Sequence, residues 1–270
     1  MRTRTKLFTL LAGLALTAAA AAAHAQAREE GRLLMASQVL QEMRGSRDQA
    51  IPDRLLERAY GIAVIPDTTK IAWFVGGRRG HGVLVVRDKD GRFSSPIFVT
   101  MTGGSFGFQW GVQSTDVVLV FTTPRGVQGI NGGKVTLGGD LSVAAGPVGR
   151  DASAATDATF KAEVYSYSRS RGAFVGLALD GTVISIDDGS DADFYGKPDV
   201  LAGDIMSGSV KSQDESARRF LAAVSTSTDN ERQASAAPAP RPQAPAPAPA
   251  TPAAAQSFPL ADPKPGSEPK

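Results

Sequence analysis

Apolar residues recur at every third or fourth position between Gly31 and Ala50, with polar residues between them. This spacing places them on one face of an amphipathic helix. A second, shorter helix is predicted after Pro52, because proline fits the first helical turn, where its missing N–H is not needed. The apolar face of the first helix contains Leu33, Ala36, Leu40 and Met43, and that of the second contains Leu55, Leu56 and Ala59.

From Gly61 the pattern changes to short apolar runs rich in β-branched residues, which favour strands. Asp90-Gly91 and Asp180-Gly181 are signals for hairpin turns. Since no helical pattern separates these runs, they predict a large antiparallel sheet closed into a barrel or packed as a sandwich. The predicted strands are 61–66, 71–75, 83–87, 93–99, 105–112, 117–121, 135–144, 160–168, 173–179 and 183–186.

The predicted strand over 105–112 has an unusual alternation. Phe106, Phe108 and Trp110 fall on one face, whereas Gly107 and Gly111 fall on the other. Glycine weakens a strand, so a stripe of it indicates either the curvature of a barrel or a groove in which a ligand lies against the backbone. Both readings stay open.

Helical spacing returns near the end of the chain. Pro198 precedes a short helical pattern that ends at Met206, and Ser212 with Glu215 forms a capping-box signal before a longer helix. The predicted fold class is therefore α+β, with N-terminal helices, a large antiparallel β barrel or sandwich, and C-terminal helices.

Both ends of the chain differ from this central domain. Residues 1–27 combine a basic start, an apolar core and a small-residue cleavage pattern, which predicts a secretory signal peptide. Residues 229–270 are rich in proline and alanine, and we expect a disordered tail because they offer little apolar surface to bury. The folded domain is thus assigned to residues 28–228. The export signal predicts a periplasmic or secreted protein.

Charge and cysteine content narrow the class further. The formal net charge is +2, but residues 1–27 contain three of the 29 basic residues and none of the 27 acidic ones, so the processed chain carries −1. This balance argues against a nucleic-acid partner held by overall charge. The chain has no cysteine, which excludes disulfides and a lipidated cysteine anchor.

The inventory of reactive residues predicts no enzyme and no cofactor. The two histidines are His24, at the predicted cleavage site, and His81, within a glycine-rich segment that we interpret as a loop. No serine lies in a G-x-S-x-G nucleophile elbow, and a cysteine nucleophile is impossible.

Two charged clusters remain as candidate sites. Lys70, Arg78 and Arg79 could gather on one rim of the sheet and attract anionic headgroups, or they could form an ordinary solvated rim. Four carboxylates close in sequence could hold a calcium ion, but their spacing does not match an EF-hand loop, and the turn signal at Gly189-Ser190 makes a turn the more natural explanation. These carboxylates are Asp187, Asp188, Asp191 and Asp193.

The order of residues across about 31 to 225 resembles the SYLF domain family, which occurs in bacterial exported proteins and in eukaryotic actin-patch and phosphoinositide-binding proteins. The matching segments are Ile51-Pro52, Leu55-Leu56, Ala59-Tyr-Gly-Ile-Ala-Val-Ile-Pro66, Gly80-His-Gly-Val83, Ser94-Ser-Pro96, Gly104-Ser-Phe-Gly-Phe-Gln-Trp-Gly-Val-Gln113, Asp116, Gly139, Gly146-Pro-Val-Gly-Arg150, Tyr165-Ser-Tyr-Ser168, Gly172-Ala-Phe-Val-Gly176 and Phe194-Tyr-Gly196.

The resemblance implies lipid binding without catalysis, with an anionic phospholipid or membrane surface as the partner. In eukaryotic relatives an N-terminal amphipathic segment contacts membranes. Here that segment would be Leu33 to Met43, which makes Leu33, Leu40 and Met43 candidate lipid contacts together with the basic rim. The alternative is an envelope structural or adaptor protein that contacts a protein partner through its Pro/Ala tail.

Overall fold

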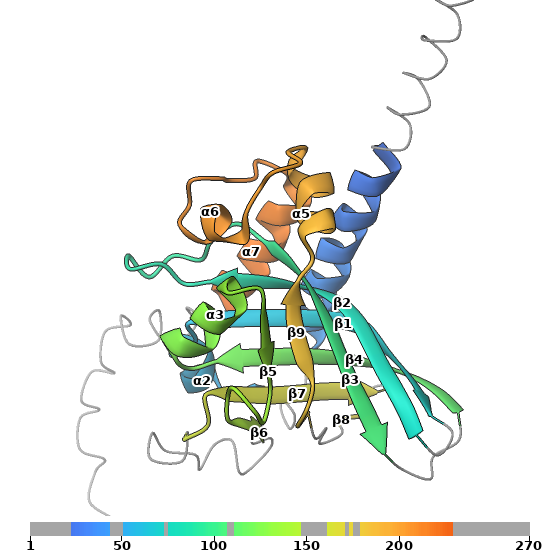
Figure 1. Cartoon of the computed structure of the whole chain (residues 1–270). Coiled ribbons are helices and arrows are strands. Elements are labelled where there is room, and N and C mark those ends of the chain that lie inside the picture. Colours follow the sequence, from blue (N-terminus) through green and yellow to red (C-terminus); the bar gives the residue numbers. More distant parts are fainter. Residues whose placement is uncertain are drawn as a thin grey trace, which may run out of the picture.

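A strongly curled nine-stranded sheet forms the centre of the computed structural model (Figure 1), which describes residues 23–43, 51–72, 75–106, 111–146, 161–170, 173–174 and 179–228. The strand order is β5-β9-β3-β2-β1-β4-β7-β6, and β8 pairs with β7. All neighbours are antiparallel except β6 and β7. The strands are β1 (Gly61–Ala72), β2 (Val75–Val86), β3 (Ile97–Phe106), β4 (Gly111–Phe121), β5 (Lys134–Thr136), β6 (Val143–Ala145), β7 (Val164–Ser170), β8 (Ala173–Phe174) and β9 (Val183–Ile186).

The curl brings the two edge strands of the sheet towards each other. β5 and β6 follow each other in sequence, and Leu137 and Leu141 form an isolated bridge between them. In the described part of the chain no full ladder closes the sheet, so it forms a half-barrel. The predicted α+β class is confirmed.

Helices cover both faces of the half-barrel. The N-terminal helix (23–43), α2 (Asp53–Glu57), α5 (Asp188–Tyr195) and α7 (Glu215–Thr228) pack into one hydrophobic cluster with the sheet. α3 (Pro124–Asn131) and α6 (Ala202–Met206) pack into a second cluster on the opposite face. Residues alternate between the clusters along each central strand: Ile62 and Val64 face the first, Ala63 and Ile65 the second. Burial on both faces explains why these strands are almost continuously apolar.

The glycine-rich segment 76–82, which we interpreted as a loop, lies within strand β2. Close packing of neighbouring strands explains the glycines. A Cβ on Gly80 would lie 2.5 Å from Ile65 Cγ2, and one on Gly82 would lie 2.5 Å from the Val64 carbonyl oxygen. Glycine here permits close backbone approach rather than a turn.

The two ends of the predicted strand 105–112 lie in different strands, residues 105–106 in β3 and residues 111–112 in β4, and residues 107–110 lie outside the described residues. Two helices were not predicted. α3 contains two glycines that lower its helical propensity, but Thr123 caps it and Ile130 packs in the core. α5 occupies the acidic segment read as a turn or a calcium loop, with Asp187 as its N-cap and Gly196 in the left-handed conformation as its C-cap.

The C-terminal helices agree with the pattern, with one change in capping. α7 begins after Asp214, whose Oδ1 accepts a hydrogen bond from the Ser216 N–H at 2.7 Å. Ser212, the predicted cap, instead accepts from the Asp214 N–H at 3.1 Å. The greater part of the predicted signal peptide (1–22) and the tail (229–270) lie outside the described residues. Within the part of the chain that the structure describes, no helix has the length and apolar content needed to cross a membrane.

Candidate functional site

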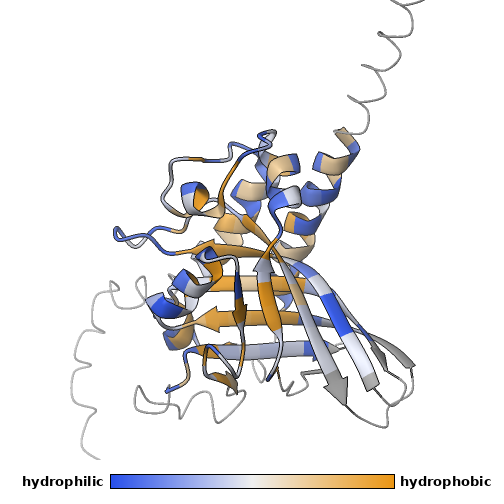
Figure 2. Ribbon diagram, in the orientation of Figure 1, coloured by the Kyte–Doolittle hydropathy of each residue, from blue (hydrophilic) through white to orange (hydrophobic). Residues whose placement is uncertain are grey.

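Four strands continue past the helices and form a projecting end of the half-barrel, which we call the distal sheet (Figure 1). It consists of 67–72 of β1, 75–79 of β2, 102–106 of β3 and 111–115 of β4. In the described residues, pairing of β9 with β3 stops at Thr102 and pairing of β7 with β4 stops at Asp116. Figure 2 shows that hydrophobic colouring concentrates in the covered part of the sheet, whereas β2 is hydrophilic in its distal part.

A β-bulge in β1 marks the boundary of the distal sheet. The register of β1 shifts after Val64 against β2 and after Ile65 against β4, and Asp67 adopts a positive φ of 48°. Asp116 supports the bulge by accepting a hydrogen bond from the Asp67 N–H at 3.1 Å. Bulges bend a strand and increase its twist, which turns the distal sheet away from the axis of the core strands.

The three basic residues predicted as a rim all lie in the distal sheet. Lys70 and Arg78 are directly opposite each other on β1 and β2, so their side chains share one face. Arg79 is opposite Thr69 and Thr102 on the other face. Sequence reasoning found these residues but not their division between two faces, which depends on the strand register.

Gly103 leaves room for the side chain of Arg78. Gly103 lies opposite Arg78 on β3, and a Cβ there would lie 2.8 Å from Thr182 Oγ1 and 3.4 Å from Arg78 Cγ. Arg78 therefore lies across bare backbone, which half-buries its side chain and lowers its pKa. A Cβ on Gly77 or Gly104, which share the face of Arg79, would meet nothing within 4 Å. The open backbone of the distal sheet is therefore on the Arg79 face.

The three basic residues of the distal sheet outnumber its carboxylates. Among its described residues the only carboxylate is Asp67, which accepts a hydrogen bond from Ser114 Oγ at 3.0 Å. Lys70 and Arg79 form no ion pair with any residue that the structure describes. Like charges placed directly opposite each other, as Lys70 and Arg78 are, destabilise a sheet. A bound anion would relieve this repulsion.

The other predicted lipid contacts lie in the core. Leu33 and Met43 have no exposed surface and Leu40 has 2%. They pack against the sheet together with α7, so in this structure they contact protein. The large apolar residues exposed on the same helix are Leu34 and Met35, at 44% and 45%.

Asp187, one of the four predicted calcium carboxylates, belongs to a charged cluster that attaches the N-terminal helix to α5. Arg32 contacts Glu29 at 2.9 Å and Asp187 at 3.8 Å, and its guanidinium lies 5.3 Å from the Phe98 ring. Ser190 Oγ donates to Glu29 at 3.1 Å. Sequence reasoning missed Glu29 and Arg32, although their i,i+3 spacing is a signal for a helical ion pair.

His81 joins this cluster from β2. Its Nδ1 lies 3.3 Å from both Asp187 Oδ2 and Thr100 Oγ1. Burial favours a higher pKa for Asp187, but hydrogen bonds from Ser190 and His81 and the charge of Arg32 outweigh it and lower the pKa. No group of three or more acidic or histidine side chains among the described residues is arranged to hold a metal ion. Two of the four predicted carboxylates pair with arginines of the N-terminal helix instead, Asp187 with Arg32 and Asp193 with Arg28.

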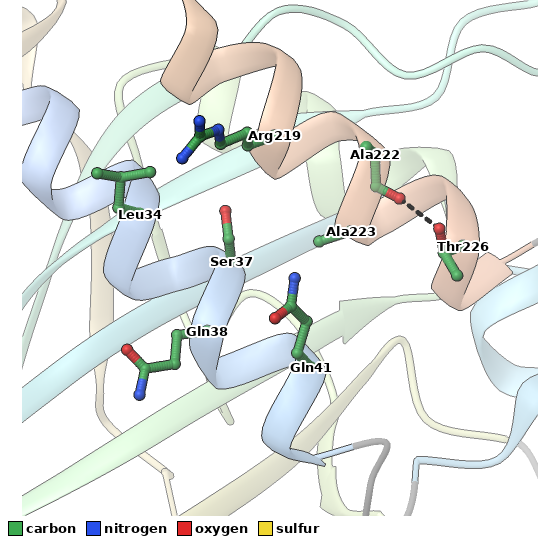
Figure 3. Close-up of a pocket in the computed structure, with 8 residues that line it drawn as sticks. All are labelled: Leu34, Ser37, Gln38, Gln41, Arg219, Ala222, Ala223 and Thr226. Carbon is green, nitrogen blue, oxygen red and sulfur yellow. Dashed lines mark hydrogen bonds between the residues drawn. The ribbon is translucent and has the colours of Figure 1, made fainter.

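A groove lies between the N-terminal helix and α7 (Figure 3), with a volume of about 580 Å³. Its only strong charge, Arg219, is paired with Glu215 at 3.0 Å. Apart from the apolar Leu34, the remaining lining is small or polar: Ser37, Gln38, Gln41, Ala222, Ala223 and Thr226. This groove is therefore a weaker candidate for an anion-binding site than the distal sheet.

These features define a class of protein: an α+β half-barrel covered by helices on both faces, with a basic, glycine-rich projecting end. Residues 102–227 match a family described as "Ysc84: Las17-binding protein actin regulator". This match and those to the relatives below confirm the resemblance to the SYLF (Ysc84) domain family seen in the sequence.

Similar proteins occur in yeast and in vertebrates. The chain is 39% identical over 167 residues to LAS seventeen-binding protein 3 of Saccharomyces cerevisiae, covering 61% of this chain and 36% of the relative. It is 34% identical over 166 residues to SH3 domain-containing YSC84-like protein 1 of Homo sapiens, covering 61% and 48%. The chain thus spans half or less of the length of these relatives.

Proposed function

We propose that this protein is an exported, non-enzymatic module of the cell envelope that binds anionic phospholipid surfaces through its distal sheet. The observation that carries the proposal is the placement of Lys70, Arg78 and Arg79 around one engaged carboxylate on open, glycine-rich backbone. Phosphate groups suit such a site because lysine and arginine donate charge-assisted hydrogen bonds to them.

The membrane would meet the ends of the strands rather than one face of the sheet. Lys70 and Arg78 point to one face and Arg79 to the other, so a surface lying along either face would reach only part of the charge. All three residues lie within a few positions of the strand ends, at a rise of about 3.3 Å per residue. Their long side chains bring the charges towards a surface at that end.

Vesicle co-sedimentation tests this proposal. The chain without residues 1–27 should sediment with vesicles containing phosphatidylglycerol and remain in solution with pure phosphatidylcholine. Because each basic residue near an anionic surface contributes about 1 kcal/mol, Lys70→Gln/Arg78→Gln/Arg79→Gln should weaken binding about 100-fold. Higher salt should weaken binding of the parent chain, because charge attraction is screened.

A matched control removes the same charge elsewhere. Arg54, Lys134 and Lys197 are exposed and lie outside the distal sheet, so changing all three to glutamine should reduce binding far less. Equal loss in both variants would mean that net charge, not the distal sheet, determines binding. Binding to no lipid composition would refute the proposal.

Export is tested separately. Expression of the full chain in a Gram-negative host should yield an envelope or secreted form whose N-terminus begins after Ala25 or Ala27, as read by mass spectrometry. An uncleaved cytoplasmic product would contradict export while leaving lipid binding to be judged by the vesicle experiment.

A protein-binding role is the second candidate, and the relatives' names favour it, since the yeast relative is named for binding LAS seventeen. In this chain the contact arm would be the Pro/Ala tail. Deleting residues 229–270 should then abolish recovery of an envelope protein in a pull-down and leave vesicle binding intact. Unchanged recovery would contradict the adaptor role.

A further inference from the structure

A pocket of about 810 Å³ lies beyond the opposite end of β2, between the β2–β3 hairpin and the segment that joins α6 to α7. We call it the hairpin pocket. Residues 87–90 and 92–95 form one wall, residues 206–208 and 211–213 form the other, and Leu221 of α7 completes it. Its volume falls in the range of pockets that hold small molecules, about 300–1,000 Å³.

The two walls are connected by a hydrogen bond. The Ser212 N–H donates to Ser95 Oγ at 3.1 Å, and both Ser95 and its neighbour Ser94 are buried. Within the second wall, the Val210 N–H donates to the Asp204 carbonyl oxygen at 3.1 Å. The pocket is therefore preformed, which reduces the entropy lost when a ligand binds.

Charge in the hairpin pocket favours an anion. Both carboxylates of the pocket form hydrogen bonds within the turn of the hairpin. Asp88 Oδ1 accepts hydrogen bonds from the N–H groups of Asp90 and Arg92 at 2.9 and 2.8 Å, and Asp90 Oδ2 accepts one from Arg92 Nη2 at 3.0 Å. Against these two carboxylates the lining holds four cations, Arg87, Lys89, Arg92 and Lys211. Neither Lys89 nor Lys211 has an ion pair with a described residue.

Lys211 lies along the wall of the pocket. A Cβ on Gly208, which has a φ of +77°, would lie 3.5 Å from Lys211 Cε. The glycine therefore leaves space for the aliphatic stem of Lys211 to run across the backbone. The ammonium group remains able to meet a ligand, as is usual for a long basic side chain.

Apolar side chains supply the rest of the surface. Phe93, Met206 and Leu221 line the pocket and are only partly buried against the core. The Phe93 ring is held in place by Arg87, whose guanidinium lies 4.6 Å from the ring centroid. The pocket thus combines cations with an apolar surface. An inorganic anion would contact only the cations and leave the apolar surface exposed to water.

From this combination we propose that the hairpin pocket binds a single-chain anionic amphiphile, with its phosphate or carboxylate at Lys89 and Lys211 and its apolar part against Phe93, Met206 and Leu221. The site is separate from the distal sheet, because the two lie at opposite ends of β2, and it would take up one molecule from solution rather than a membrane surface.

Isothermal titration tests the proposal with a short-chain lysophosphatidate below its micelle concentration. The purified chain should bind it with one site, and Lys89→Gln/Lys211→Gln should weaken binding at least tenfold. Lys134→Gln/Lys197→Gln, which removes two exposed lysines outside the pocket, should leave affinity unchanged. Met206→Gln should weaken binding because it replaces an apolar thioether with a polar amide of similar length, with circular dichroism checking that the variant folds.

Two comparison ligands separate the sources of affinity. Lysophosphatidylcholine, which has no net charge, should bind at least tenfold more weakly, and inorganic phosphate should bind more weakly still. The proposal would be overturned if lysophosphatidylcholine or inorganic phosphate bound as tightly as lysophosphatidate. It would also be overturned if Lys89→Gln/Lys211→Gln left the affinity for lysophosphatidate unchanged. The variant of Lys70, Arg78 and Arg79 should lose vesicle binding and keep lysophosphatidate binding, so failure of either site is recognised independently.

Discussion

Asp191 is a carboxylic acid enclosed by the core of this protein. It has no exposed surface, and its Oδ1 accepts the Phe98 N–H at 2.9 Å. Its Oδ2 has no hydrogen-bond partner among the described residues. Burial, together with the charges of Asp188, Asp187 and Glu29, raises the pKa of Asp191 to about 8. The side chain is therefore protonated at neutral pH.

Replacing Asp191 with asparagine should stabilise the protein increasingly as pH rises. The pKa in the folded state, about 8, exceeds the ordinary value of 3.8, so folding takes up a proton between these values. Stability from the protonated acid is complete below pH 3.8 and is lost as pH rises through 8. Asparagine keeps the bond from Phe98 without this loss.

Urea unfolding of Asp191→Asn and the parent chain at pH 5, 6.5 and 8 measures this effect. The advantage of the variant should grow with pH by up to about 1.4 kcal/mol per unit. A difference in unfolding free energy that stays constant with pH would show that Asp191 is ionised in the folded protein.

At the scale of elements, the N-terminal helix shows that amphipathicity alone does not identify a membrane contact. Its predicted apolar face, with Leu33, Leu40 and Met43, packs inside the protein. The charged cluster of Glu29, Arg32 and Asp187 holds the same helix at α5. Both contacts make this helix part of the domain's core.

Leu40→Ala should therefore lower the free energy of unfolding by about 2–5 kcal/mol, because it leaves a cavity in a packed region. Leu34→Ala, on the exposed side of the same helix, should change it by no more than about 0.5 kcal/mol. Denaturant titration of both variants measures the difference. Equal, small effects would indicate that the helix is detached from the core in solution.

Most elements could be predicted from local pattern, and the failures have physical causes. The strands 61–66 and 83–87 were recognised because both of their faces are buried. The outer halves of β1 and β2 were misread because their glycines and charges depend on neighbouring strands, which one sequence segment does not reveal. α3 was missed because packing overrides its weak propensity.

The candidate site was predictable in composition only. Lys70, Arg78 and Arg79 are close in sequence, which suggested a rim. Their distribution over two faces and the position of Gly103 beneath Arg78 follow from the register of β1, β2 and β3. The hairpin pocket gave no signal, because its walls are more than a hundred residues apart in the chain.

At the scale of the whole molecule, the two proposed anion sites lie at opposite ends of β2, which has 12 residues and spans about 40 Å at 3.3 Å per residue. The helices occupy the space between these ends on both faces of the sheet (Figure 1). A molecule resting on a membrane with its distal sheet would therefore keep the hairpin pocket away from that membrane. Membrane attachment and capture of a soluble amphiphile could then occur together.

Intrinsic fluorescence can test this orientation directly. The chain has two tryptophans, Trp73 between β1 and β2 and Trp110 between β3 and β4, so both are joined in sequence to strands of the distal sheet. Tryptophan favours the membrane interface, where its ring meets apolar and polar surroundings. End-on binding should shift tryptophan emission to shorter wavelength with phosphatidylglycerol vesicles, and brominated lipid should quench it.

Single variants and a ligand control identify the source of this signal. Trp73→Phe and Trp110→Phe assign the emission change to each position, and lysophosphatidate bound in the hairpin pocket should leave the emission unchanged. Vesicle binding without any change in emission would refute the end-on orientation and direct attention to another surface.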